Sequence, residues 1–379
     1  MKKLCAIVFS AVIFILNSFS VNADTLSVSA KSAILIDAQT GRVIYEKNAY
    51  QKRPMASTTK IMTTLLALEY GDLETYFTVD SEAIKVEGSS MGLCQGDMVR
   101  LIDLCYGMML PSGNDAANAT AVRIGGSIDN FVALMNDKAQ AIGMKDTHFV
   151  TPSGLDDYTD EHYSTAYDMA LLTRVALENE KFREICGEKY GKTEFGNPPF
   201  ERWLTNTNKL LSTCDGVFGV KTGFTDKAKR CLVSACERNG VTLICITLNA
   251  SDDWNDHMKL YNYGFSEYKN TPLPAQHQTL RFSVVGGDKS YVDATLMSAP
   301  TAPLSEGELD RVKAVYRVNR FLYAPVNMGD VVGEVSYYLD DLLICKSQFL
   351  ATSDVFIKTP KPKKENFIEK LFSGLKGLF

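Results

Sequence analysis

The amino-acid sequence predicts an α+β protein in which an antiparallel sheet is sandwiched by helices and carries a helical insert. Strand-like runs stand near both ends of residues 24–271, with helical patterns between them. Short runs rich in Val, Tyr, Phe and Leu then fill residues 272–357 and predict a small all-β domain. Apolar residues recur at helical spacing in the lysine-rich segment 358–379, which predicts a terminal amphipathic helix. A length of 379 residues suits two folded domains.

Residues 1–23 have the features of a signal peptide rather than of the fold. Lys2 and Lys3 precede an apolar run from Leu4 to Leu16, and Val21-Asn22-Ala23 is a small-residue cleavage site before Asp24. An uncleaved membrane anchor is the alternative, which the short apolar run disfavours. We therefore expect an exported protein.

The elements of the first domain follow from apolar periodicity and from turn residues. A hairpin is expected around the turn at residues 39–41, and a second one around Asn239-Gly240, which is a strong hairpin signal. Between them the pattern is mostly helical. In chain order, the expected strands are 32–37, 42–46, 217–221, 231–236 and 241–248. The expected helices are one between Pro54 and Gly71 with Ser57 in its first turn, followed by 101–110, 115–122, 128–142, 168–178 and 254–268.

The helix that follows Pro54 is the element around which this domain is organised. Its apolar run, residues 61–68, covers more than one stripe, so the helix should be buried on most sides and end at Gly71. Positions i and i+3 share a helix face, which places the Lys60 amine within reach of the Ser57 hydroxyl.

The Ser-x-x-Lys spacing alone carries little information, because about one such match is expected by chance in a chain of this length. Two others occur, at Ser266 and Ser373. Ser57 differs from them in its buried helical setting and in two further motifs downstream. These are Ser112-Gly113-Asn114, on a loop after Pro111, and Lys221-Thr222-Gly223, on a strand. Each residue has an ordinary structural explanation, but those explanations leave the order of the motifs unexplained.

Together the motifs form a site for acyl transfer. Ser57 would attack a carbonyl and Lys60 would accept its proton, which gives an acyl-enzyme. Ser112 can relay a proton to the leaving group, and Asn114 can hydrogen-bond the substrate backbone. Lys221 adds positive charge that helps to keep Lys60 neutral and attracts a carboxylate.

The strand motif should complete the site. Thr222 can hydrogen-bond the substrate carboxylate, and Gly223 allows a close approach to the strand. We expect the backbone N–H groups of Ser57 and Phe224 to bind the oxyanion. The four histidines are scattered and should be structural or exposed, and no Gly-x-Ser-x-Gly nucleophile elbow accompanies them.

The chain resembles the low-molecular-mass penicillin-binding proteins, the serine-type D-alanyl-D-alanine carboxypeptidases. The matching segments are Pro54-Met55-Ala56-Ser57-Thr58-Thr59-Lys60, Met109 to Asp115, Phe149 to Leu155, His162 to Asp168 and Gly219 to Asp226. The resemblance implies a transpeptidase-like fold, removal of the terminal D-Ala from the peptidoglycan stem peptide, acylation by β-lactams, and location on the outer face of the bacterial membrane. It implies no cofactor and no metal.

Two departures from the family pattern bear on substrate binding. Phe224 stands where some relatives carry His, and should still provide its backbone N–H. Some relatives also place an arginine for the substrate carboxylate where this chain has residues 249–252. That role is expected to fall to Lys221, Thr222 and Thr225.

Three rival functions share part of this pattern. A β-lactamase needs a glutamate in Glu-x-x-Leu-Asn, and residues 201–205 lack the Asn. A D,D-endopeptidase acting on cross-links would use the same chemistry, so that alternative stays open. A non-catalytic wall-binding scaffold would be expected to have lost a motif residue, and none is lost.

Charge separates the body of the protein from its C-terminal segment. The net charge is −5, or −7 without the leader lysines; residues 358–379 carry six lysines and two glutamates, which leaves −11 for residues 24–357. An acidic body argues against a nucleic-acid partner. After the stiff linker at 359–364, the amphipathic helix is too short to span a bilayer but suits the surface of an anionic membrane. Docking on the protein's own core is the alternative.

Nine cysteines are present, eight of them after the leader. An even number in an exported protein can mean disulfides, but the spacing is irregular and no Cys/His cluster points to a metal. We favour mostly reduced, structural thiols, and the sequence leaves both possibilities open.

Overall fold

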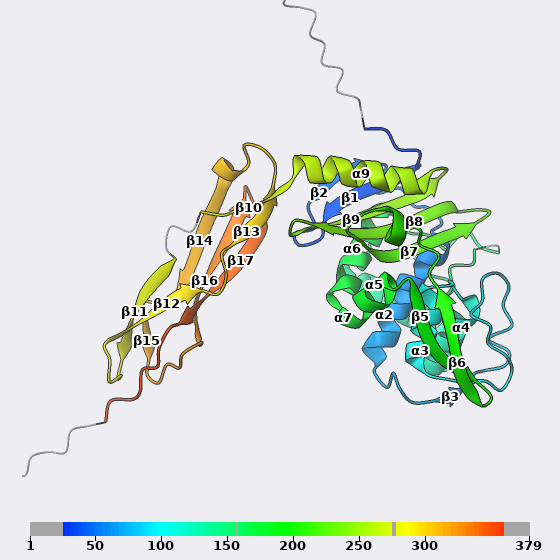
Figure 1. Cartoon of the computed structure of the whole chain (residues 1–379), viewed down its shortest axis with the longest axis horizontal. Coiled ribbons are helices and arrows are strands. Elements are labelled where there is room, and N and C mark those ends of the chain that lie inside the picture. The colour runs from blue at the N-terminus through cyan, green and yellow to red at the C-terminus, as the bar shows by residue number, and fades with distance from the viewer. Residues whose placement is uncertain (1–25, 157, 275–277, 360–379) are drawn as a thin grey trace, which may run out of the picture. The chain divides into compact units, whose positions relative to one another are not determined.

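The computed structural model describes residues 26–156, 158–274 and 278–359, which form two compact units that divide after Ser266 (Figure 1). The predicted signal peptide, residues 1–23, and the predicted amphipathic helix that follows the linker at 359–364 lie outside the described residues. The predicted α+β class with a C-terminal β-domain is confirmed. Each unit has its own hydrophobic core.

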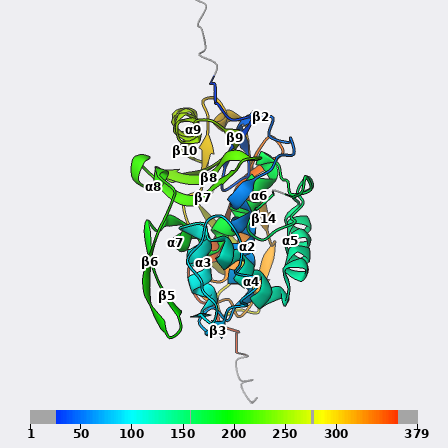
Figure 2. The ribbon, with the colours of Figure 1, turned by 90° about the vertical axis from the view of Figure 1, so that its right-hand side faces the viewer.

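The first unit is built on a five-stranded antiparallel sheet in the order β2-β1-β9-β8-β7, and Figure 2 shows β9, β8 and β7 of this sheet beside one another. Asn239 and Gly240 have the positive φ angles of the expected tight turn between β8 and β9. Strand β7 lies at the edge of the sheet, so one of its sides is free to pair with another chain. The strands are β1 (Ser32–Asp37), β2 (Val43–Lys47), β7 (Val217–Thr225), β8 (Lys229–Arg238) and β9 (Val241–Ala250).

Both faces of this sheet are buried, because side chains alternate between two cores. On β1, Ile34 and Ile36 point into the large core formed with the helical part, whereas Leu35 joins a smaller core that includes Leu260 and Tyr261 of α9 (Asp253–Glu267). This double burial explains why the strand reads as a continuous apolar run.

The predicted central helix is confirmed as a buried pillar, although it begins differently from the expectation. Ala56–Thr59 form a 3-10 turn (η1), and α2 (Lys60–Tyr70) continues from it to Gly71. Most of α2 is buried, and it packs against four of the other predicted helices. These are α3 (Leu101–Met109), α4 (Asn114–Gly125), α5 (Ile128–Ile142) and α6 (Ala166–Glu178).

The helical middle also contains elements that the sequence did not predict. Two of these are short helices, α7 (Glu180–Gly187) and α8 (Leu210–Thr213). The third is a β-hairpin formed by β5 (Tyr190–Gly196) and β6 (Pro199–Thr205). This hairpin extends a small sheet with β3 (Phe77–Thr78) and β4 (Met98–Val99). Gly, Lys and Glu give β5 a low strand propensity. Side-chain contacts compensate, since Arg202 lies 4.1 Å from the ring of Phe195 on the opposite strand and 4.2 Å from the ring of Phe200 on its own strand.

The second unit is the predicted all-β domain. Its main sheet has the order β14-β16-β17-β12-β11-β15, and a two-stranded sheet pairs β10 with β13. Its core includes Val335, Tyr337 and Phe349. Strand β10 extends across the predicted domain boundary after residue 271, and that boundary stays a prediction. The strands are β10 (Lys269–Pro272), β11 (Thr279–Val285), β12 (Tyr291–Leu296), β13 (Thr301–Leu304), β14 (Val312–Val318), β15 (Phe321–Tyr323), β16 (Val331–Leu339) and β17 (Leu342–Ala351).

Candidate active site

Ser57 and Lys60 meet at the junction of η1 and α2. Lys60 Nζ lies 2.9 Å from Ser57 Oγ, and the same nitrogen donates to Asn114 Oδ1 and to the Ser153 carbonyl, both at 2.7 Å. A neutral amine has two N–H bonds and one lone pair. Because two carbonyl-type acceptors use the N–H bonds, the lone pair is left for the Ser57 hydroxyl.

The surroundings of Lys60 favour this neutral form. Lys60 is fully buried, and burial lowers its pKa well below the ordinary value, with the charge of Lys221 acting in the same direction. Asp115 opposes these effects, but its carboxylate is occupied elsewhere: it accepts hydrogen bonds from Ser90 and from the backbone of residues 91–93. The amine is thus prepared to accept a proton.

Gly154 holds the turn that supplies the Ser153 carbonyl. Its φ angle is +90°, and a Cβ here would stand 2.0 Å from the Ala56 carbonyl oxygen and 2.9 Å from Thr59 Oγ1. Only glycine therefore fits this close contact between the turn and η1.

Gly154→Ala is expected to destabilise the protein by about 3 kcal/mol or more, since it adds a backbone clash to an unfavourable φ. Chemical unfolding of the variant measures this loss. Gly126→Ala is the matched control, because Gly126 has φ +73° with nothing within 4 Å of the added carbon. Equal losses in the two variants would show that the clash contributes nothing.

The second motif is positioned by the connection between α3 and α4. Ser112 has a φ of +68° and faces the cleft, whereas Asn114 is the first residue of α4 and is buried. One N–H of the Asn114 side chain donates to the Glu87 carbonyl at 2.7 Å. The amide retains a second N–H that a ligand can use.

The third motif lies on the edge strand β7. Lys221 is buried, with its Nζ donating to the Thr222 carbonyl at 3.0 Å, and burial lowers its pKa to about 7. Thr222 Oγ1 lies 2.8 Å from Thr207 Oγ1, on the loop before α8. A Cβ on Gly223 would approach the Ser57 backbone nitrogen to 3.1 Å. Glycine here therefore keeps the Ser57 N–H accessible beside β7.

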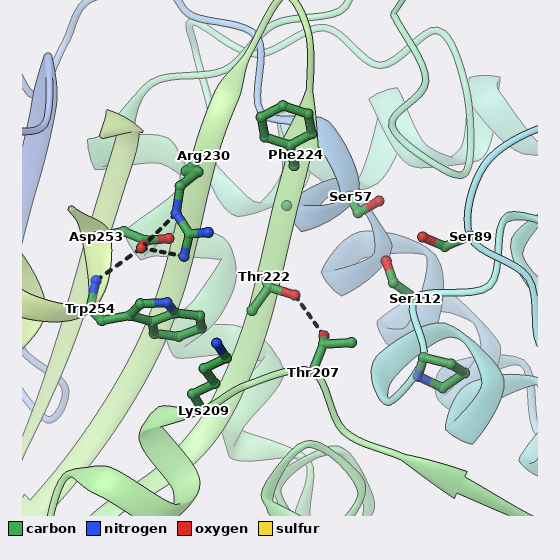
Figure 3. A pocket seen from close by; sticks show the side chains of 12 residues that line it. Ser57, Ser89, Ser112, Thr207, Lys209, Thr222, Phe224, Arg230, Asp253 and Trp254 are labelled. Atoms are coloured by element: carbon green, nitrogen blue, oxygen red, sulfur yellow. Dashed lines mark hydrogen bonds and ion pairs between the residues drawn. The ribbon is translucent and has the colours of Figure 1, made fainter. Parts of the chain in front are cut away.

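A cleft of about 360 Å³ joins these segments (Figure 3). The cleft is lined by Ser57, Ser89, Pro111, Ser112, Thr207, Lys209, Thr222, Gly223, Phe224, Arg230, Asp253 and Trp254. Five of the nine residues expected from sequence line it directly, and Lys60, Asn114 and Lys221 are buried residues of the same three motifs. Thr225 is not among the lining residues; its hydroxyl donates to Asp156 Oδ2 at 3.1 Å.

Arg230 is the charged residue nearest the third motif among the cleft residues that the sequence analysis did not predict. It lies opposite Phe224 in the β7–β8 ladder, and its Nε and Nη2 both donate to Asp253 Oδ1, at 2.9 and 2.6 Å. The guanidinium also lies 5.2 Å from the Trp254 ring centroid. Figure 3 shows Arg230 and Trp254 across β7 from Ser57. Arg230 is nine residues after Lys221, and only the strand pairing places it beside the motif.

The residues of the rival chemistries lie elsewhere. His162 Nδ1 accepts from the Val150 N–H, so its Nε2–H donates to Thr59 Oγ1, and burial lowers the pKa of this histidine to about 3. His162 thus stays neutral and stabilises η1 through its hydrogen bond to Thr59. Glu201 is exposed on β6 and pairs with Lys192, away from the lining residues. Among the described residues, no cluster of three or more His, Cys, Asp or Glu could hold a metal.

Two family models match the chain. One, described as D-alanyl-D-alanine carboxypeptidase, matches residues 17–252, and one described as penicillin-binding protein 5, C-terminal domain, matches residues 268–356. The chain belongs to the D-alanyl-D-alanine carboxypeptidase family. It is a serine D-Ala-D-Ala carboxypeptidase of the penicillin-binding class, as its sequence led us to expect.

Relatives extend over most of this carboxypeptidase. The D-alanyl-D-alanine carboxypeptidase DacF of Bacillus subtilis is 32% identical over 90% of this chain and 88% of its own length. DacC of Escherichia coli is 33% identical over 83% and 81%. The crystal structure of penicillin-binding protein 5 from Haemophilus influenzae is similar with a TM-score of 0.64 and 30% identity, and the match covers 87% of this chain and 98% of that one.

Proposed function

We propose that Ser57 is the nucleophile of this carboxypeptidase and that Lys60 is its general base. The observation that carries the proposal is the 2.9 Å contact between Ser57 Oγ and a buried amine whose N–H bonds are already used. Ser57 gives its proton to Lys60 as Oγ attacks the substrate carbonyl. The bond to the terminal D-Ala then breaks, and water later hydrolyses the acyl-enzyme on Ser57.

The stem peptide binds along the free edge of β7 as an additional strand. Its backbone pairs with the edge near Phe224, and the remaining N–H of Asn114 donates to a substrate carbonyl. The developing oxyanion accepts hydrogen bonds from the backbone N–H groups of Ser57 and Phe224, which the small size of Gly223 brings close together. Ser112 passes a proton to the departing amine. β-Lactams acylate Ser57 by the same route.

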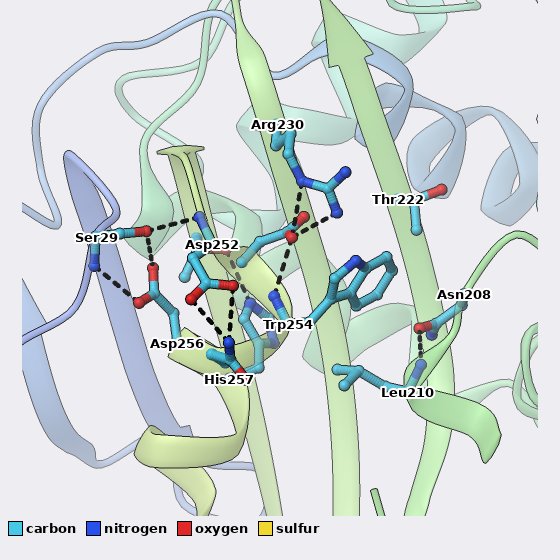
Figure 4. A network of polar contacts seen from close by, with 12 residues as sticks. Ser29, Asn208, Leu210, Thr222, Arg230, Asp252, Trp254, Asp256 and His257 are labelled. Carbon is cyan, nitrogen blue, oxygen red and sulfur yellow. Dashed lines mark hydrogen bonds and ion pairs between the residues drawn. The ribbon is translucent and has the colours of Figure 1, made fainter. Parts of the chain in front are cut away.

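Arg230 takes over part of the expected role of Thr225 in holding the terminal carboxylate. The Thr225 hydroxyl is engaged by Asp156, whereas the Arg230 guanidinium lines the cleft with Thr222. Asp253 and Trp254 fix its orientation (Figure 3). The two Arg230 donors meet one carboxylate oxygen (Figure 4), which leaves other N–H bonds for a ligand.

Arg230→Gln is expected to raise the KM for peptides ending in D-Ala-D-Ala about 10- to 100-fold with a smaller change in kcat, because it removes a charge-assisted hydrogen bond to the substrate. Steady-state D-Ala release measures this effect. For the same peptide with a C-terminal amide, the wild type and the variant should have the same KM, because the substrate carboxylate is absent.

Arg230→Gln also leaves the buried Asp253 carboxylate without its positively charged partner. A control must therefore distinguish weaker substrate binding from this effect on Asp253. The double variant Arg230→Gln/Asp253→Asn removes both charges and should behave like the single variant. Arg281→Gln breaks an exposed pair with Asp293 in the second unit and should leave KM unchanged. Equal KM changes for acid and amide peptides would remove the carboxylate role.

The experiment that tests the function is incubation with a pentapeptide ending in D-Ala-D-Ala, followed by assay of free D-Ala. A wild-type protein that neither releases D-Ala nor becomes labelled by penicillin would favour the non-catalytic scaffold. Cleavage of cross-linked peptides in the same assay would identify endopeptidase activity on the same site.

The family acts on peptidoglycan peptides outside the cytoplasm. On this basis the enzyme is proposed to work at the outer face of the bacterial membrane, held there by the basic and apolar segment 358–379. No helix within residues 26–156, 158–274 and 278–359 is long and apolar enough to cross a bilayer. Flotation of the whole chain with anionic vesicles tests the membrane contact.

A further inference from the structure

Cys214 and Cys236 are brought together at the start of β7, outside the catalytic cleft. Cys214 opens a tight turn in which the Val217 N–H donates to the Cys214 carbonyl at 3.2 Å, and Val217 then pairs with Cys236 across the β7–β8 ladder. The Cys236 thiol donates to the Asp215 carbonyl at 3.4 Å, one residue after Cys214. The two sulfurs therefore lie at the same turn, close enough to influence each other's ionisation.

The turn that carries Cys214 is fixed against β8. Gly216 has a φ of +80°, and a Cβ there would lie 2.4 Å from the Glu237 carbonyl oxygen and 3.2 Å from Cys236 Sγ. The Glu237 N–H donates to the Gly216 carbonyl at 2.9 Å, and Arg238 Nε donates to the Asp215 carbonyl at 3.0 Å. These contacts hold the backbones on which the two thiols stand.

Charge and exposure make Cys214 the reactive member of the pair. It is partly exposed, whereas Cys236 is buried. Arg238 Nη2 lies 3.4 Å from Cys214 Sγ. Contact with Cys236 and the nearby Arg238 lower the pKa of the Cys214 thiol to about 7, while the same contact raises the pKa of Cys236. A partly exposed thiol that ionises near neutral pH thus lies beside a thiol that can act as its partner.

From this geometry we infer that Cys214 and Cys236 are a disulfide-forming site, oxidised by exchange with a low-molecular-mass disulfide. The Cys214 thiolate attacks one sulfur of that disulfide, which forms a mixed disulfide and releases one thiolate. The Cys236 sulfur then attacks Cys214 Sγ, forms the internal S–S bond, loses its proton to solvent and releases the second thiolate. The protein gives up two electrons and the external disulfide is reduced to two thiols.

The other cysteines among the described residues lack this arrangement. Cys105, Cys186, Cys231 and Cys245 are buried, and burial raises the pKa of each thiol. Cys94 is exposed, with its hydrogen bond going to the Gly92 carbonyl. Cys345, in the second unit, is half-buried; its thiol donates to the Lys346 carbonyl, and burial raises its pKa. The bridge would connect β8 to the turn that begins β7, and so brace the strand that carries Lys221 and Thr222.

The test is incubation of the native full-length protein with oxidised glutathione, alkylation of remaining thiols and tryptic mapping. Cleavage after Lys209, Lys221 and Arg230 places Cys214 alone on one peptide and Cys236 on another with Cys231, so fragmentation assigns the bridge. A Cys214–Cys236 link is expected, with the melting temperature raised by about 5 °C or more.

Variants separate the bridge from general oxidation. Cys214→Ser is a substitution at a partly exposed position, and should lose both the link and the melting-temperature rise. Cys94→Ser, the matched control at an exposed thiol, should retain both. A stable glutathione adduct on Cys214, alkylation of both cysteines, or a link from Cys214 to Cys231 or Cys245 would each overturn the assignment.

Discussion

Ser57→Ala is expected to lower the rate of D-Ala release by at least about 10⁴-fold and to abolish covalent labelling by penicillin. The reason is that the acyl-enzyme requires Ser57 Oγ, which lies 2.9 Å from its base in a cleft with no substitute nucleophile on η1. Thr58 and Thr59 cannot replace it, because their hydroxyls donate to the Met55 and Ala56 carbonyls. Release of D-Ala and gel detection of labelled penicillin provide the two measurements.

The control for this variant must show that the fold survives. Ser57→Ala removes one oxygen at a partly buried position, so its melting temperature should stay close to that of the wild type. Ser212→Ala, at an exposed residue of α8, is the same chemical change away from the motifs and should keep full activity. Persistent labelling of a folded Ser57→Ala protein would assign the nucleophile to another residue.

Lys60→Arg is expected to slow acylation by at least about 10³-fold, because arginine stays protonated and cannot accept the Ser57 proton. The rate of penicillin acylation, measured under single-turnover conditions, isolates this step from later hydrolysis. Lys138→Arg, in a surface ion pair with Glu69 on α2, is the matched substitution and should have no effect. A Lys60→Arg enzyme that acylates at the wild-type rate would exclude Lys60 as the base.

The same chemistry predicts a pH profile. Lys60 must be neutral to act, so kcat/KM should fall as the pH drops through its lowered pKa, which is held down by burial and by Lys221. Lys221 has a pKa of about 7 and loses its charge above that value, which weakens carboxylate binding on the alkaline side. Because the two amines interact, the apparent pKa values of the two limbs are properties of Lys60 and Lys221 together and not of either amine alone. Lys60→Arg should abolish the acid limb.

The motifs could be found from sequence because they depend on short-range geometry. The spacing from Ser57 to Lys60 places two side chains on one helical face, and apolar periodicity shows that this face is buried. The α2, α5 and β8–β9 elements were predictable for the same reason: helix periodicity and the Asn239-Gly240 turn act within a few residues. The β5–β6 hairpin was not, since its stability comes from side-chain contacts of Arg202 rather than from strand propensity.

The sequence by itself determined the order of the three motifs, the α+β class, the second β-rich domain and the acyl-transfer chemistry. Tertiary structure alone decided that β7 is an edge strand, that Arg230 rather than Thr225 faces the cleft, and that Cys214 and Cys236 lie at the same turn. The physical reason is that strand pairing joins residues by register, across any separation along the chain, whereas sequence patterns report only the neighbours within a turn or a single strand.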